Sequence, residues 1–144
     1  MKDDFVVRPR TAGGWDQIVG ALARLFERLA ATGEPHCVLV ELAEDRYVQF
    51  IIRPDGSVWS ESVGDVYLDD GDEFDDDQRR VLAQLGWNAP ELFGPGHGSY
   101  WREYDEGHLL DAASSVASTF IEVFGAEPHE SVYVGLFTAS ALRG

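Results

Sequence analysis

Three short runs of β-branched and aromatic residues, separated by two turn clusters, fill the stretch from Cys37 to Val63. The runs cover residues 37–42, 46–53 and 57–63. Runs of this composition, bounded by turn residues, are typical of strands. Between the second and third runs, Pro54-Asp55-Gly56 predicts a tight turn, because proline presets φ and glycine adopts a positive φ at little cost. We therefore expect an antiparallel meander of three strands, against which the other segments must pack.

Alternation along these runs predicts two sheet faces of different character. One face is apolar and carries Val38, Val40, Leu42, Val48, Phe50 and Ile52. The opposite face is mixed and carries Leu39, Tyr47, Ile51 and Trp59 beside Gln49, Arg53 and Glu41. The simpler interpretation is that a helix or a later strand covers the mixed face. The functional interpretation is a protein-contact surface, since exposed apolar patches mark interaction sites.

The remaining segments predict three helices and two further strands. We expect helices at 15–31, from near 75 to 85, and at 106–124, each ending at or just before a glycine or a Thr-Gly pair. Residues 100–104 and 131–138 are expected to be strands, and the last one is expected at a sheet edge or paired with another chain. The chain of 144 residues then forms one α+β domain, with residues 1–13 as an extended lead-in. Its order is α-β-β-β-α-β-α-β, an antiparallel sheet of about five strands with helices packed on one face or end.

The chain is strongly acidic, with a formal net charge of -15 from 26 acidic and 11 basic residues. This balance argues against nucleic acid and anionic membranes as partners, because both need a basic face. No apolar run approaches the ~20 residues that span a bilayer. The first seven residues lack the apolar core of a signal peptide, so we expect a cytoplasmic protein. The single cysteine, Cys37, lies in a predicted strand and is expected to be a buried, inert thiol.

Eight acidic residues and no basic residue lie between Asp65 and Asp77. A calcium loop with Gly71 at its sixth position would place Val66 at its first position, where valine cannot ligate. The run is better explained as a solvated helix start, because acids in a first turn complement the helix dipole. The alternatives are weak, adventitious cation binding and a docking site for a basic partner. That site would consist of Asp69, Asp70, Asp72, Asp75, Asp76 and Asp77.

Catalytic patterns are weak in this sequence. The four histidines lie near element ends or in loops without helical metal-ligand spacing. His97 and His108, with Asp105 nearby, make a thin candidate for acid–base chemistry, but ordinary surface histidines explain the same pattern better. The glycine-rich segment 91–99 lacks the Lys-Ser/Thr pair of a phosphate loop. We therefore expect no enzyme, no metal and no cofactor.

Several short motifs in a fixed order resemble the TY-Chap family, actinobacterial domains related to type III secretion chaperones and YbjN-like proteins. The motifs are Trp15 in the first helix, Tyr47 to Phe50 in the second strand, Leu85-Gly86-Trp87 closing the second helix, Pro90, and Tyr100-Trp101-Arg102 before the last helix. The resemblance spans residues 15–125. The sequence departs from the family pattern in the glycine-rich loop before Tyr100 and at the C-terminus.

The resemblance implies a type III secretion chaperone-like fold that binds peptides or partly unfolded client proteins without ATP. The implied binding surface is the sheet face and its neighbouring grooves. Here this means Leu39, Tyr47, Gln49, Ile51 and Trp59, with Trp87 and Trp101 as further candidates. Type III secretion chaperones are typically dimers, so the resemblance also makes a homodimer an option. It supplies no catalytic residue.

Two functional hypotheses follow. The leading one is a chaperone or adaptor that captures an extended client segment on the mixed face, or at a sheet edge by strand addition. The alternative is an acidic immunity or inhibitor protein that neutralises a basic toxin or enzyme through the acidic run 65–77.

Overall fold

The computed structural model describes residues 14–43, 46–63, 74–90, 98–127 and 132–138, together with the backbone of residues 2–7. The elements are β1 (Lys2–Val7), α1 (Gly14–Ala30), β2 (His36–Ala43), β3 (Arg46–Ile52), β4 (Val58–Ser62), α2 (Asp76–Gln84), β5 (Tyr100–Tyr104), α3 (Leu109–Glu122) and β6 (Val132–Thr138). The predicted α+β class and the predicted order of elements are confirmed. The additional strand, β1, lies in the segment that was expected to be an extended lead-in.

The described strands form one antiparallel sheet in the order β1-β6-β2-β3-β4-β5. The predicted meander is β2-β3-β4, and its second turn closes with Gly56 at φ 87° and with the Gly56 N–H donating to the Arg53 carbonyl at 2.9 Å. The expectation that β6 would be an edge strand is wrong. It lies between β1 and β2, because β1 pairs with its outer side from Lys2 to Val7.

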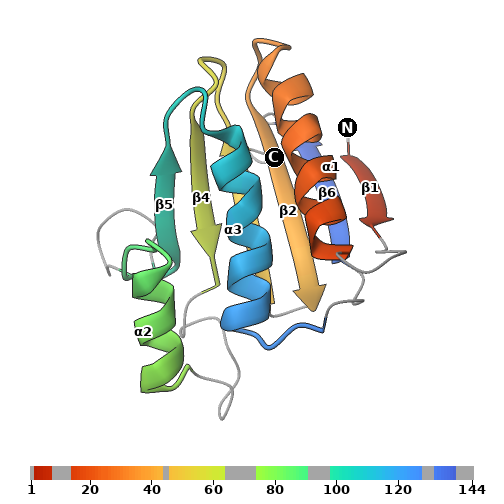
Figure 1. The fold of residues 1–144 in the computed structure, drawn as a ribbon. Coiled ribbons are helices and arrows are strands. Elements are labelled where there is room, and N and C mark those ends of the chain that lie inside the picture. The colour runs from red at the N-terminus through yellow and green to blue at the C-terminus, as the bar shows by residue number, and fades with distance from the viewer. Residues whose placement is uncertain are drawn as a thin grey trace.

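Helices α1 and α3 lie side by side across one face of the sheet, and α2 contacts α3 at the end of the sheet near β5 (Figure 1). The core lies between these two helices and the apolar face predicted from the meander. Phe26 of α1 packs on Phe50 of β3 with their ring centroids 4.8 Å apart, and both are fully buried. Trp15 meets Phe120 of α3 edge-on at 5.9 Å and donates from Nε1 to the Glu127 carbonyl at 2.9 Å. These contacts fix both helices on the same side of the sheet.

Helix α2 begins where the acidic run ends. The Asp75 carboxylate accepts a hydrogen bond from the Gln78 N–H at 2.7 Å, and the Gln78 side chain accepts one from the Asp75 N–H at 2.9 Å. This reciprocal arrangement is a capping box, which satisfies two N–H groups at a helix start. The predicted role of acids at this helix start is thus observed at Asp75.

Replacing the capping side chain tests this arrangement. Asp75→Ala should lower the free energy of unfolding by ~1 kcal/mol, the usual cost of losing an N-cap. The matched control is Arg80→Ala, which removes only the exposed 2.9 Å ion pair with Asp77 and should change stability by less than ~0.5 kcal/mol. Urea denaturation followed by circular dichroism measures both. Equal effects of the two substitutions would contradict the capping role.

Candidate functional site

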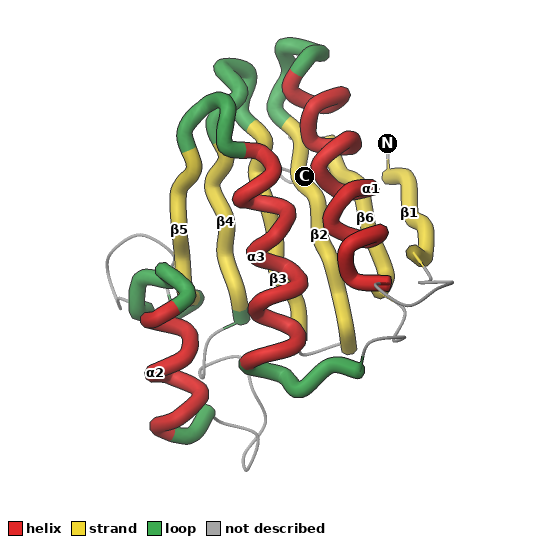
Figure 2. The backbone as a smooth tube through the Cα atoms, in the orientation of Figure 1, coloured by secondary structure: helices red, strands yellow, loops and turns green. Residues whose placement is uncertain are grey.

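No described element packs on the sheet face opposite the helices (Figure 2). Because paired residues of an antiparallel sheet share a face, the register defines what this face carries. One row across β2, β3, β4 and β5 is Leu39, Gln49, Glu61 and Trp101, and the next is Cys37, Ile51, Trp59 and Glu103. A third row joins Glu41 to Tyr47 and Tyr133. We call the surface formed by these residues and Arg53 the open face, within which Cys37 is only 1% exposed.

The predicted peptide-binding residues of the sheet meet on the open face. They are Leu39, Tyr47, Gln49, Ile51, Trp59 and Trp101, and each is partly exposed. They come from four neighbouring strands, so strand alternation and register alone bring them together. The simpler interpretation of the mixed face was that a helix or a later strand of this chain covers it. Within the described residues, that interpretation finds no support.

Two tryptophans form a stacked aromatic pair at one side of the open face. The rings of Trp59 and Trp101 stack with their centroids 5.2 Å apart and their planes 9° apart. The indole N–H of Trp59 donates to the Glu61 carboxylate at 2.9 Å, which fixes the orientation of that ring. An aromatic surface of this kind offers a large apolar area with little side-chain entropy left to lose.

The charged groups of the open face are mostly acidic. Arg53 pairs with Glu103 at 3.0 Å, with both side chains about half exposed. Glu41 and Glu61 add two further carboxylates to the same face. The open face therefore combines apolar contact area with a surplus of negative charge.

Trp87 does not lie on the open face, and its inclusion in the predicted binding set is corrected. It is 4% exposed and packs in the core on the helix side of the sheet. Its indole N–H donates to Oγ1 of Thr119 in α3 at 3.0 Å, and this bond is buried. Trp87 follows the end of α2 directly, where the chain turns back towards the sheet and an apolar residue is drawn into the core.

The outer edge of the sheet at β5 is partly occupied by the chain itself. Asn88 and Trp101 exchange two backbone hydrogen bonds of 2.9 and 3.1 Å. The Asn88 side-chain amide donates a further bond to the Trp101 carbonyl at 3.1 Å. The backbone groups of Trp101 that point away from β4 are therefore already paired.

The alternative docking site lies only partly within the described residues. Asp69, Asp70 and Asp72 lie outside them, as does His97. Asp75 caps α2, whereas Asp76 and Asp77 pair with Arg79 and Arg80 at 3.3 and 2.9 Å. His108 contacts Asp111 at 3.2 Å on the surface. Within the described part of the chain, no three metal-ligating side chains come together.

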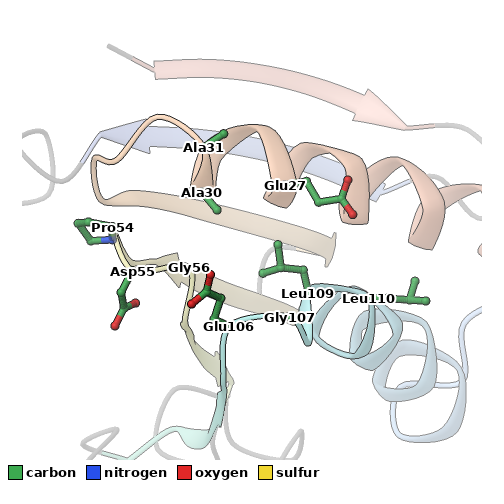
Figure 3. Close-up of a pocket in the computed structure, with 10 residues that line it drawn as sticks. All are labelled: Glu27, Ala30, Ala31, Pro54, Asp55, Gly56, Glu106, Gly107, Leu109 and Leu110. Atoms are coloured by element: carbon green, nitrogen blue, oxygen red, sulfur yellow. The ribbon is translucent and has the colours of Figure 1, made fainter.

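A groove of about 500 Å³ opens at the end of the domain where α1 ends and α3 begins (Figure 3). The carboxylates of Glu27, Asp55 and Glu106 surround it, and Leu109 and Leu110 form part of its wall. Leu110 is 61% exposed. Sequence reasoning missed this groove because its lining comes from three distant segments. The Asp55 carboxylate also accepts bonds from the N–H and hydroxyl of Ser57, and these bonds lower the pKa of Asp55.

The sequence matches the TY-Chap3 family, described as T3SS (YopN, CesT) and YbjN peptide-binding chaperone 3, over residues 8–132. The chain belongs to this family. No curated protein and no solved structure gives a match. As a TY-Chap3 domain, the chain has a general chaperone or peptide-binding role, and its partner is a peptide or a protein. Binding domains of this kind are typically not enzymes. None of the described helices has both the length and the apolar character needed to cross a membrane.

The placement of Trp87 leads to a prediction that separates stability from binding. Trp87→Phe keeps most of the apolar volume but removes the donor to Thr119, so the free energy of unfolding should fall by ~1–3 kcal/mol. Thermal denaturation measures this loss. In this TY-Chap3 domain, peptide affinity measured well below the unfolding temperature should stay unchanged, and a large loss of affinity would show that Trp87 takes part in binding.

The Cys37 thiol gives a second prediction. Burial, and secondarily the negative charge of Glu61, raises its pKa to about 11. A thiol-specific reagent at pH 8 should label the urea-unfolded chain rapidly and the native chain hardly at all, because the thiolate is the reactive form. Since the folded pKa lies above the unfolded value, this thiol's contribution to stability is complete below pH 9 and is lost as the pH rises to about 11. Fast native labelling at pH 8 would contradict the burial.

Proposed function

We propose that this TY-Chap3 domain is an ATP-independent chaperone or adaptor of the cytoplasm that holds an apolar client segment on its open face. One observation carries the proposal. All the predicted binding residues except Trp87 lie together on the one sheet face that no described element covers. The family, described by its peptide binding, supports the same role.

The side chains of the open face can supply the energy for such binding. Trp59, Trp101, Tyr47 and Ile51 are partly exposed, so a client would remove further apolar area from water. Tryptophan and tyrosine are the commonest residues at interface hot spots, where truncation to alanine costs ~2 kcal/mol or more. The net charge of -15 would keep a complex with an apolar segment in solution.

Face capture has more support than strand addition at β5. A strand added at that edge needs a series of outward backbone groups, and those of Trp101 are bonded to Asn88. Contacts made on the face depend on side chains and leave the sheet ladders unchanged. We therefore assign the client to the open face.

A matched pair of substitutions tests the proposal. Ile51→Ala removes an apolar side chain from the open face, whereas Ile121→Ala removes the same side chain, 42% exposed, from the outer surface of α3. Short peptides that tile the proteins of the native host supply the ligands, and fluorescence anisotropy measures their affinities. We expect Ile51→Ala to weaken the best peptides by ~tenfold and Ile121→Ala to leave them unchanged.

Trp59→Ala should have a larger effect than Ile51→Ala, since more area is lost. If both open-face variants bind as the wild type does, the proposal is wrong. If affinity is instead lost when Asp75, Asp76 and Asp77 are replaced by asparagine, the acidic inhibitor hypothesis becomes the better account.

A further inference from the structure

We infer that the client occupies the open face as an amphipathic α-helix whose apolar stripe is flanked by basic residues. The inference rests on the proposed function and defines the ligand class of that site. It follows from three properties of the described structure: the state of the sheet's backbone groups, the partly occupied edge at β5, and the charge of the open face.

The backbone of the sheet offers nothing to an extended client on its face. The strands beneath the open face are β2, β3, β4 and β5, and the three inner ones are hydrogen-bonded to neighbours on both sides. An extended segment lying on this face would bury its own N–H and C=O groups without partners from the sheet. A helix pairs these groups internally, so only its side chains need partners. The face therefore favours a helical client.

The β5 edge offers an extended client only an interrupted series of backbone groups, and the β1 edge lies far from the aromatic residues. Alternate residues of β5 point their backbone groups outward, and Asn88 already pairs with those of Trp101. The other edge is β1, and β6 and β2 lie between it and β3. A strand added at β1 would lie ~19 Å from Ile51, given ~4.8 Å per strand. It could not contact Ile51, Trp59 or Trp101.

The helix-covered side shows that this sheet accepts helices. There α1 lies along the strands and buries Ile18, Leu22 and Phe26 on the apolar face (Figure 1). The open face carries a comparable apolar set, including Ile51 and the stacked pair Trp59 and Trp101. A helix ~10 Å wide covers about two strands. One client helix over β3 and β4 would therefore contact Tyr47, Ile51 and Trp59, with Trp101 at its flank.

The charges around this apolar set determine which residues are favoured beside the apolar stripe of the client helix. Three glutamates and one arginine give the open face a net negative charge, and Glu61 lies within the apolar set, where its carboxylate accepts the Trp59 indole N–H. Lysine or arginine beside the apolar stripe would meet these carboxylates, and could also lie over the indole rings as cation–π partners. Acidic flanks would meet like charge on the face and in the domain as a whole.

Three designed peptides of equal length test the inference. The first carries leucine and lysine in a helical pattern, the second has the same composition in strict alternation, and the third replaces lysine by glutamate in the helical pattern. Anisotropy measures affinity for the intact protein, and circular dichroism measures peptide helicity. We expect the first peptide to bind at least ~tenfold more tightly than the other two and to gain helicity when bound.

Two variants show that binding occurs at the open face. Glu61→Gln should weaken the lysine helix severalfold, and Ile51→Ala should weaken it by ~tenfold, whereas Ile121→Ala should have no effect. Binding that is insensitive to Ile51→Ala would be general attraction to an acidic protein and would overturn the inference.

The outcomes separate this inference from the proposed function. Equal binding of the alternating peptide, or no gain in helicity, overturns the helical client. If the glutamate helix binds as tightly as the lysine helix, the inference of basic flanks is overturned. If none of the three peptides binds while the tiled host peptides still depend on Ile51, the inference fails and the proposed function stands.

Discussion

One-sided burial is the constraint on which the rest of this structure depends. The apolar face of the sheet is closed by α1 and α3, with Phe26 against Phe50 and Trp15 against Phe120. Because both helices take the same face, most of the buried apolar side chains lie on that side of the sheet. The open face then carries apolar side chains that the fold does not need to bury fully. This division lets a small domain keep a stable core and still present an apolar surface to a partner.

The four tryptophans follow this division. Trp15 and Trp87 lie on the helix side, and each donates its indole N–H to an acceptor of this chain. Trp59 and Trp101 stack on the open face. Under the proposed function, the net charge of -15 would keep a complex with an apolar client in solution and would favour basic clients over acidic ones. The distribution of the tryptophans over the two faces of the sheet is therefore consistent with the peptide binding for which the family is described.

Local patterns predicted most of the fold and much of the candidate site. Alternation placed Leu39, Tyr47, Ile51 and Trp59 on one face, because side-chain direction in a strand follows from position alone. The pairing of strands that are distant in the sequence was harder to predict. The sequence contains no local signal that β1 joins the sheet and makes β6 an inner strand. Trp87 was misplaced because its direction depends on how the chain leaves α2. The groove at Glu27, Asp55 and Glu106 was missed because three distant segments form it.

The central claim is that clients bind the open face and leave the helix side unchanged. Nuclear magnetic resonance of the indole N–H groups tests it most directly, since four assigned signals report on both sides of the sheet. During titration with a bound peptide, the account predicts large shifts for Trp59 and Trp101 and small ones for Trp15 and Trp87. Shifts confined to Trp15 and Trp87, or none at saturation, would contradict it.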